Sequence, residues 1–337
     1  MATTLVDLTR PLEDAFSRAI TYLRVSVTDK CNLRCIYCMP EAGFQWLQRA
    51  ELLSYEEIVR IVRAAASVGV RAIRLTGGEP LVRRDLHRLV RAIAQVPGID
   101  DVSLSTNGLL LEESVDALCA AGLRRVNISL DTLREERFAS MARREGLARV
   151  LAGIDAALAR GLAPVKINCV VMRGRNDDEL DDFAQLTAAK PLYVRFIEVM
   201  PAHENLELQR DTYIGADEII EHLSRNHDLL PVAGPRGNGP ARYFGYAGAP
   251  GAVGVISPLS HDYCERCNRV RLSADGRLRL CLFGDQHVDL RTAVRTGASE
   301  AELAALLAGA MLIKPERHHL RLGEASSRMR ALSEIGG

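Results

Sequence analysis

The chain has 337 residues, of which 47% are hydrophobic and 26% charged, a composition ample for a buried core. Lys plus Arg and Asp plus Glu each number 43, so no overall field favours binding to nucleic acid or to a membrane surface. No apolar run approaches the roughly 20 residues needed to span a bilayer. Charged residues interrupt the first 20 positions, so we expect no signal peptide and a cytoplasmic protein with reduced cysteines.

Short β-rich runs alternate with helical stretches over the first two-thirds of the chain. This spacing predicts βαβ units with a parallel sheet, which could curl into a partial barrel or lie open as a doubly wound sheet. The capping box Ser54-Tyr-Glu-Glu57 begins the first helix and Gly69 ends it, while Gly122 and Gly161 end two later helices. The expected strands are Leu23–Thr28, Ala72–Leu75, Asp101–Ser105, Arg125–Leu130, Val165–Val171 and Tyr193–Glu198.

The pattern changes after about residue 200. Residues 231–258 are rich in Gly and Pro, and Val270–Leu280 is typical of a hairpin that turns at Asp275-Gly276. Short helices are expected near 289–296 and 299–311. We therefore divide the chain into a βα unit at 15–230 and a C-terminal extension at 231–337, packed against the first unit.

Unusual polar and glycine-rich segments follow the predicted strands, where each strand ends. They are Cys31–Cys38, Thr76–Pro80, Ser105–Gly108, Ser129–Asp131 and Met200-Pro201. Parallel α/β architectures bind their ligands at the carboxyl ends of the strands. The sequence therefore predicts one shared active site on this rim.

Six of the eight cysteines form two triplets, each one thiolate short of the four that a closed zinc or iron–sulfur site uses. The triplets are Cys31, Cys35, Cys38 and Cys264, Cys267, Cys281. Two metal centres with open positions are therefore indicated. Cys119 and Cys169 stand alone in apolar stretches and are interpreted as small buried hydrophobes.

The first triplet, with Tyr37 inside it and Gly77-Gly78-Glu79-Pro80 after the second strand, resembles the radical S-adenosylmethionine superfamily. The resemblance implies a partial βα barrel of about six units, with a [4Fe–4S] cluster on Cys31, Cys35 and Cys38. The open iron of that cluster would bind S-adenosylmethionine, whose reductive cleavage gives a 5′-deoxyadenosyl radical. Residues implied in the S-adenosylmethionine pocket are Tyr37, Gly78, Ser129 and Met200.

The second triplet, the run Asn268-Arg-Val-Arg271 and the terminal Gly336-Gly337 narrow the resemblance to the GTP 3′,8-cyclases. These lyases act at the first step of molybdenum cofactor biosynthesis. The resemblance implies a second [4Fe–4S] cluster on Cys264, Cys267 and Cys281, carried by the C-terminal extension and contacting guanine. The Gly-Gly tail would reach into the site. Positions implied in GTP binding are Arg24, Arg74, Ser105, Lys166, Arg269, Val270 and Arg271.

A triphosphate favours Arg, whose planar fork pairs with phosphate oxygens, and Arg269 and Arg271 project to the same face of a strand. One position departs from the family. The family often has a basic residue where this chain has Ala72, and Arg71 would point to the opposite face. The missing contact would then be absent or supplied from elsewhere, with Arg195 as the candidate.

Two other classes of protein remain open on the residues alone. One is another radical enzyme with an auxiliary cluster, such as a peptide-modifying maturase. The other is a zinc-stabilised binding module, in which His261 or His287 completes a Cys3His site on the second triplet. The family resemblance further implies a flavodoxin- or ferredoxin-type electron donor, cyclic pyranopterin monophosphate synthase as the downstream partner, and a homodimer.

Overall fold

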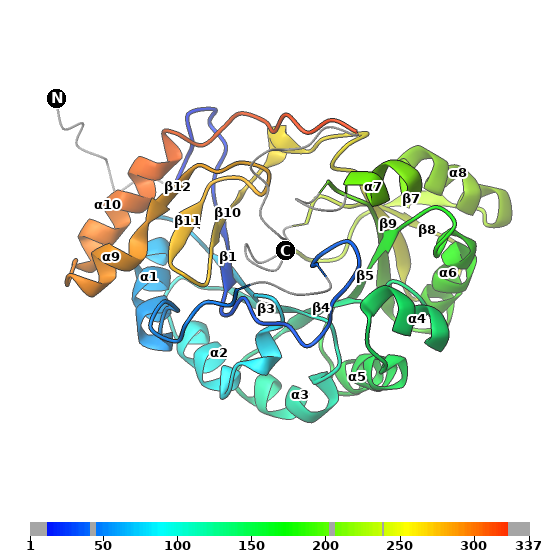
Figure 1. Ribbon diagram of the computed structural model, residues 1–337, viewed down its shortest axis with the longest axis horizontal. Coiled ribbons are helices and arrows are strands. Elements are labelled where there is room, and N and C mark those ends of the chain that lie inside the picture. Colours follow the sequence, from blue (N-terminus) through cyan, green and yellow to red (C-terminus); the bar gives the residue numbers. More distant parts are fainter. Residues whose placement is uncertain (1–11, 41–44, 202–205, 238, 323–337) are drawn as a thin grey trace.

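The computed structural model describes residues 12–40, 45–201, 206–237 and 239–322. Its strands form one twelve-stranded sheet in the order β12-β11-β10-β1-β2-β3-β4-β5-β6-β9-β8-β7. The sheet curves into an arc that stays open on one side, so the protein has a partial barrel (Figure 1). The first six strands are β1 Tyr22–Ser26, β2 Ala72–Thr76, β3 Asp101–Thr106, β4 Arg125–Ser129, β5 Val165–Val171 and β6 Leu192–Glu198.

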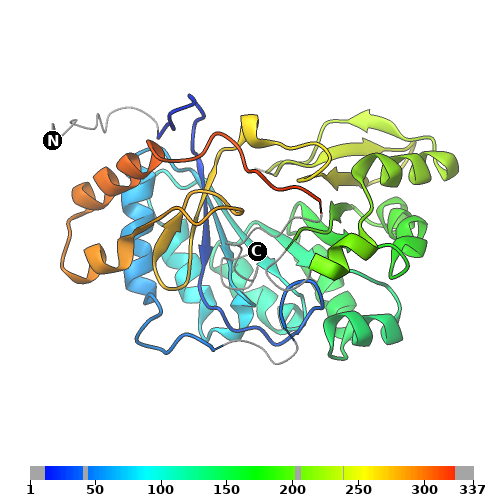
Figure 2. The ribbon, with the colours of Figure 1, turned by 45° about the horizontal axis from the view of Figure 1, so that its top comes forward.

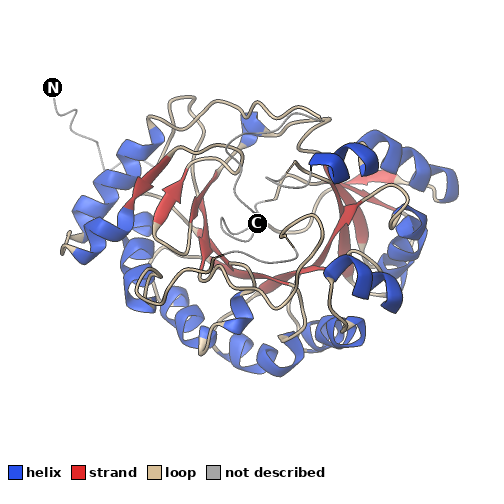
Figure 3. Ribbon diagram, viewed as in Figure 1, coloured by secondary structure: helices blue, strands red, loops and turns tan. Residues whose placement is uncertain are grey.

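Helices cover the convex face of the arc, and strands line its interior (Figure 3). Burial of the apolar face of each helix against this sheet forms the main core, in which Leu23, Ile73 and Val194 are fully buried. The helices of the βα units are α1 Tyr55–Ser67, α2 Leu86–Ala94, α3 Leu111–Ala120, α4 Glu135–Ala142, α5 Leu147–Ala159 and α6 Leu180–Ala189. Two further helices follow β6, α7 Leu206–Thr212 and α8 Ala216–Asn226.

All six predicted strands are confirmed within two residues at either end, and they pair in parallel in chain order. The capping box at Ser54 is present, with the Ser54 hydroxyl accepting from the Glu57 amide and the Glu57 carboxylate accepting from the Ser54 amide. Gly69 follows α1 with φ of 106°, which a glycine adopts without strain. The capping residues and the glycine in the sequence therefore predicted correctly where this helix begins and ends.

The C-terminal extension adds strands to both ends of the same sheet. On one side, β9 pairs in parallel with β6 and antiparallel with β8, which in turn pairs with β7. On the other side, β10 pairs in parallel with β1, and the predicted hairpin is present between β10 and β11, with Gly276 at φ of 80° in its turn. The remaining elements are β7 Leu230–Val232, β8 Arg242–Gly245, β9 Ala252–Ile256, β10 Arg269–Leu272, β11 Arg277–Arg279, β12 His287–Asp289, α9 Leu290–Arg295 and α10 Glu300–Met311. The extension therefore continues the sheet of the first unit rather than only packing against it.

Candidate active site

The first cysteine loop follows β1 and rests on the end of α4. The Arg34 amide donates to the Ala142 carbonyl at 3.0 Å, and the Ile36 amide donates to the Met141 carbonyl at 3.0 Å. Burial, then the negative charges of Asp131, Cys38 and Cys31, hold the pKa of the Cys35 thiol well above its usual range. Cys31 and Cys38 are thus close enough to Cys35 to raise the pKa of its thiol through their charges. A cationic metal centre would relieve this repulsion.

The glycine pair after β2 lets this strand end approach the cysteine loop closely. The Gly78 amide donates to the Thr28 carbonyl at 2.7 Å, and the Glu79 amide donates to the Lys30 carbonyl at 2.8 Å. A Cβ on Gly78 would lie 2.4 Å from the carbonyl oxygens of both Asp29 and Lys30. Only glycine permits such contact between two backbones.

Glu79 lies under this contact and is fully buried. Its carboxylate accepts hydrogen bonds from the Leu81 amide at 3.0 Å, the Asn107 amide at 2.6 Å and the Thr106 hydroxyl at 2.7 Å. Burial raises the pKa of this carboxyl to about 7, against the effect of these donors. Glu79 therefore ties the loop after β2 to the loop after β3.

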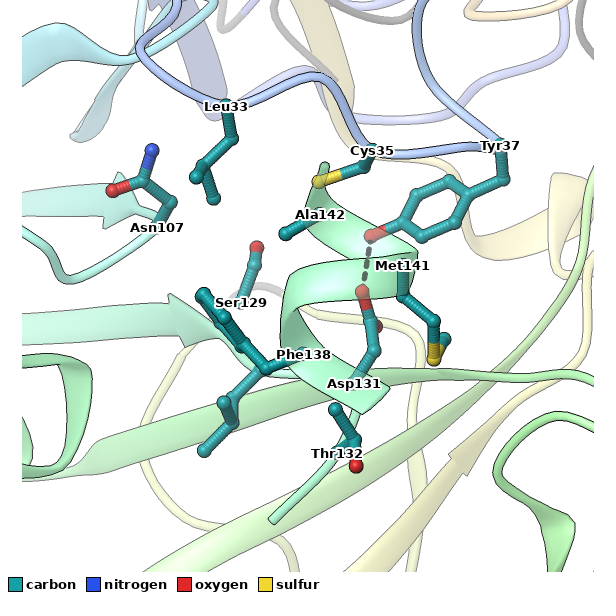
Figure 4. Close-up of a pocket in the computed structure, with 11 residues that line it drawn as sticks. Leu33, Cys35, Tyr37, Asn107, Ser129, Asp131, Thr132, Phe138, Met141 and Ala142 are labelled. Carbon is teal, nitrogen blue, oxygen red and sulfur yellow. Dashed lines mark hydrogen bonds between the residues drawn. The ribbon is translucent and has the colours of Figure 1, made fainter. Parts of the chain in front are cut away.

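Tyr37, Cys35 and Ser129 line one small pocket above the carboxyl ends of the strands (Figure 4). The Tyr37 hydroxyl donates to the Asp131 carboxylate at 2.8 Å, and this carboxylate also accepts from the Val170 amide at 2.9 Å. The pocket has a volume of ≈ 30 Å³, room for a water molecule, so these residues can form only part of a nucleoside site. Gly78 and Met200 do not line it.

Met200 lies in a separate apolar group that also includes Tyr37 and Cys38. Two of the four residues implied in the S-adenosylmethionine pocket thus share the pocket of Figure 4. Met200 meets the same cysteine loop from another side, and Gly78 supports the backbone that precedes this loop.

Basic side chains gather inside the arc because the parallel register brings them into rows. Arg24 is paired with Arg271 on one side and with Arg74 on the other. The next row joins Ser105, Asn127 and Lys166, and Arg195 of β6 pairs with Asn168. Residues of alternate position on a strand face the same side, so these rows share the concave face of the sheet. The structure thus brings together Arg24, Arg74, Ser105, Lys166, Arg269 and Arg271, the side chains expected to bind GTP, whereas Val270, 1% exposed, packs in the core behind them.

Two further basic residues join this group. Arg195 is buried, its guanidinium donates to Asn168, and it lies 3.1 Å from the Asn127 oxygen when that amide is oriented to accept. Arg125 is also buried and forms an ion pair with Asp101. Sequence reasoning named Arg195 only as a substitute and missed Arg125. Arg125 lies two residues before Asn127 on the same strand, and this spacing could have identified it from the sequence.

The crowded positive charges lower the pKa values of basic side chains on the concave face. Burial, then the charges of Arg195, Arg125 and Arg74, lower the pKa of Lys166 to about 6. Burial likewise lowers the pKa of Arg74 to about 10, helped by Arg125 and Arg195. Such an arrangement is costly without an anion, because buried charges need partners.

Several buried polar atoms on this face lack hydrogen-bond partners within the described residues. They include Tyr22 Oη, Arg125 Nη1, Arg195 Nε and Arg269 Nε. In native proteins such atoms are normally satisfied by protein, water or ligand. The site is therefore chemically suited to a polyanionic ligand.

The structure shows the consequence of having Ala72 where the family often has a basic residue. Ala72 is buried, whereas Arg71 is exposed on the other side of the strand, where it donates to the Gly98 carbonyl at 3.3 Å. Arg71 thus cannot serve the concave face. Arg195 is already on that face, close enough to Arg74 and Lys166 to lower their pKa values.

The second triad lies at the open side of the arc, on η3 Cys264–Arg266 and the loop after β11. Burial raises the pKa of Cys264, and the neighbouring thiols Cys281 and Cys267 add to the shift. Burial acts in the same direction on Cys267, but the positive charges of Lys314, Arg269 and Arg18 outweigh it and leave the Cys267 pKa below its usual value. Cys264 is thus close enough to Cys267 and Cys281 for their charges to raise its pKa, and Cys267 lies near the cations Lys314, Arg269 and Arg18.

The histidines considered for a zinc site point elsewhere. His261 lies 2.8 Å from an Asp217 carboxylate oxygen, and Nδ1 of His287 lies 2.7 Å from the Asp285 carbonyl. Across the described ranges, no three His, Cys, Asp or Glu side chains are close enough to hold a single metal ion. A [4Fe–4S] cluster is several ångströms across and is held by thiolates that lie further apart. Three thiolates are the donor set that a [4Fe–4S] cluster with one open iron would take.

Comparison with known proteins agrees with this chemistry. Residues 25–187 match the family described as the Radical SAM superfamily, and residues 192–320 match Molybdenum Cofactor Synthesis C. Among solved structures, Streptococcus suis SuiB bound to precursor peptide SuiA superposes with a TM-score of 0.61, covering 94% of this chain and 76% of that one. At 13% identity this likeness concerns the fold alone. The fold and the cysteine loop thus define a radical S-adenosylmethionine protein.

Relatives of higher sequence identity show to which family within this superfamily the chain belongs. A GTP 3′,8-cyclase of Pelotomaculum thermopropionicum is 49% identical over 97% of this chain and 100% of that protein. A GTP 3′,8-cyclase of Heliobacterium modesticaldum is 50% identical over 96% of this chain and 99% of its own length. The chain belongs to the GTP 3′,8-cyclase family, whose members carry S-adenosylmethionine and two [4Fe–4S] clusters, so the zinc-module interpretation is wrong.

Membrane association was not expected, and none of the helices in the described ranges has the length and apolar character required to cross a bilayer. The terminal Gly336-Gly337 lies outside the described residues.

Proposed function

We propose that this chain converts GTP to 3′,8-cyclo-7,8-dihydroguanosine 5′-triphosphate, the first step of molybdenum cofactor biosynthesis. One observation carries the proposal: a concave face crowded with buried cations lies between two cysteine triads, one at the strand rim and one at the open side of the arc. The near full-length relatives named as GTP 3′,8-cyclases support it.

Each triad would hold one [4Fe–4S] cluster, Cys31, Cys35 and Cys38 the first and Cys264, Cys267 and Cys281 the second. When bound, the first cluster and S-adenosylmethionine supply the radical chemistry. Tyr37, Gly78, Ser129 and Met200 would form or support the S-adenosylmethionine pocket, and Asp131 would hold the Tyr37 ring by the hydroxyl contact of 2.8 Å.

The cationic rows would hold the triphosphate. Guanidiniums on adjacent strands can pair with phosphate oxygens from several directions and so fix the triphosphate end of the nucleotide. The Ser105 hydroxyl would donate to the nucleotide, and Lys166 would regain its proton when the anion binds. The residues assigned are Arg24, Arg74, Ser105, Lys166, Arg195, Arg269 and Arg271, with Val270 placing the two arginines beside it.

Other features stay proposals that rest on family membership. They are a flavodoxin- or ferredoxin-type electron donor, cyclic pyranopterin monophosphate synthase as the consumer of the product, a homodimer and a cytoplasmic location. The division into a unit at 15–230 and an extension at 231–337 is also a proposal.

The decisive experiment compares two half-reactions in Cys264→Ala and Arg271→Ala. We expect both variants to lose GTP cyclisation, because each removes a contact at the GTP end of the site. Both should still form 5′-deoxyadenosine from S-adenosylmethionine under a strong reductant, since the first triad is intact. Product is measured by chromatography of anaerobic reactions, and Arg71→Ala, on the outer face, is the control.

Persistence of cyclisation in either variant would show that the second triad or the cationic face has another role. Loss of both half-reactions in Cys264→Ala would mean that the two triads do not act as separate centres.

A further inference from the structure

The second cysteine triad has a geometric problem that the first does not. Cys31, Cys35 and Cys38 lie within one short loop, whereas Cys264 and Cys267 are separated from Cys281 by a β-hairpin. A rigid inorganic cluster requires its ligands to be held within about 0.5 Å. Something must therefore fix the loop at Cys264 relative to the loop at Cys281.

Arg18 fixes the first of these loops. Its side chain is only 9% exposed, and its Nε donates to Asp14 at 2.6 Å. Nη1 donates to the carbonyl of Cys264 itself at 2.8 Å and also to the Glu316 carbonyl, while Nη2 donates to the Pro315 carbonyl at 2.7 Å. One buried guanidinium thus joins the cysteine loop to the chain after α10.

Lys314 fixes the second loop from the same stretch of chain. It is 3% exposed, and its Nζ donates to the carbonyl of Leu280, the residue before Cys281, at 2.5 Å. The contacts form a continuous path from Cys264 to Cys281. It runs through Arg18 and Pro315, and then through Lys314. Both ends of the path are carbonyls at or next to a cysteine ligand.

The stretch Lys314–Leu320, here called the C-terminal strap, crosses the open side of the arc over η3 (Figures 1 and 2). Further along it, the His318 ring packs against Phe283 with centroids 4.8 Å apart. Leu320 then joins the apolar group that contains Tyr37, Cys38 and Met200. The strap therefore leads from the second triad to the loop of the first.

We propose that Arg18 and Lys314 are positioning residues for the second iron–sulfur centre, clamping its two cysteine-bearing loops to the C-terminal strap. The proposal rests on the proposed second cluster at Cys264, Cys267 and Cys281. Neither residue touches the substrate or the reacting atoms.

The clamp also has an electrostatic consequence. A cluster held by thiolates is anionic, and reduction adds a further negative charge, which nearby buried cations favour. Arg18 and Lys314 should therefore raise the reduction potential of the second centre and leave that of the first centre largely unchanged, because the carbonyls to which they donate belong to the loops of the second triad and to the strap, and none belongs to the first cysteine loop.

The test uses the full chain, reconstituted without oxygen, as Arg18→Gln, Lys314→Met and the conservative Arg18→Lys. Iron and sulfide per chain, and the reduction potential of each centre by electron paramagnetic resonance titration, are the readouts. We expect iron in Arg18→Gln and Lys314→Met to fall from about eight toward about four per chain. Any second centre that remains should have a lower potential, and Arg18→Lys should recover the potential because the charge is kept.

Arg60→Gln is the matched control. Arg60 likewise donates from a partly buried guanidinium to two carbonyls, those of Val294 at 3.1 Å and Ala298 at 2.5 Å, but joins α1 to the end of α9. This variant should keep both centres. Formation of 5′-deoxyadenosine without GTP reports separately that the first centre is intact.

Parental iron together with a parental second-centre potential in both Arg18→Gln and Lys314→Met would overturn the clamp. Equal loss of iron from both centres would also overturn it, because the effect would then be general. If the parent chain itself matched Cys264→Ala at about four irons, the proposed second cluster would fail rather than the clamp.

Discussion

At the scale of single residues, the site is governed by charges that are buried without enough opposite charge. Lys166 shows this most clearly, because burial and then the charges of Arg195, Arg125 and Arg74 lower its pKa to about 6. At pH 7.5 the ligand-free lysine is therefore mostly neutral. A bound triphosphate would favour the charged form and raise the pKa again.

GTP binding should consequently take up a proton at Lys166. The ligand-free pKa of Lys166 is about 6, and the pKa in the GTP complex is higher. Between these two pKa values the affinity for GTP rises as the pH falls, by up to about tenfold per pH unit, because binding takes up a proton. Calorimetry in buffers of different ionisation enthalpy measures this uptake. Lys166→Met should lose it, and equal proton uptake by the parent and the variant would show that the lysine is not the group responsible.

At the scale of elements, buried glutamates tie together loops that follow different strands. Glu198, at the end of β6, is fully buried and accepts from the Ala216 amide at 2.9 Å and the Leu259 amide at 2.8 Å. It thereby joins α8 to the segment that leads into η3. Glu79 does the same for the loops after β2 and β3. The loops at the rim are therefore held in fixed positions relative to one another and do not act as independent motifs.

Gly78→Ala tests this register. The added Cβ would meet the carbonyls of Asp29 and Lys30 at 2.4 Å, so the loop after β2 must move away from the cysteine loop. We expect at least a tenfold loss of S-adenosylmethionine cleavage, equivalent to about 1.4 kcal/mol. Product formation under a strong reductant measures it. Gly161→Ala is the control, because no atom lies within 4 Å of its added Cβ, although its φ of 72° carries a modest strain. Unimpaired cleavage in Gly78→Ala would show that this close approach is dispensable.

At the scale of the whole molecule, two ends of one sheet face each other across the open side of the arc. The β9–β8–β7 strands extend one end and the β10–β11–β12 strands extend the other. The C-terminal strap spans the gap between them (Figure 2). Because each cluster would hold three side chains together, and the second would crosslink segments separated by a β-hairpin, cofactor loading and global stability should be coupled.

Removing iron with a chelator should therefore lower the melting temperature. The shift is roughly 1–2 °C per kcal/mol of lost binding energy, since unfolding entropy grows with chain length. Calorimetry of the parent, of Cys35→Ser and of Cys267→Ser, each loaded and stripped, measures it. The single-triad variants should melt between the loaded and the stripped parent. Identical melting of the loaded and stripped parent would mean that the clusters bind without stabilising the fold.

Much of the local structure can be predicted from short stretches of sequence. Strand boundaries, the capping box at Ser54 and the Asp275-Gly276 turn are local, because propensity and hydrogen bonding over a few residues decide them. The first cysteine loop could be recognised for the same reason, since its three cysteines lie within eight positions. The placement of polar segments after successive strands was enough to predict a common rim.

The pairing of segments that are distant in the chain is seen only in the folded structure. No local pattern says that β10 lies beside β1, and this pairing alone sets Arg271 against Arg24. Arg125 looks like an ordinary strand residue until the strand pairing places it on the concave face. Arg18 and Lys314, almost three hundred residues apart, meet at one strap for the same reason. Long-range pairing depends on how all faces of the sheet are buried together, and that is a property of the whole chain rather than of any segment.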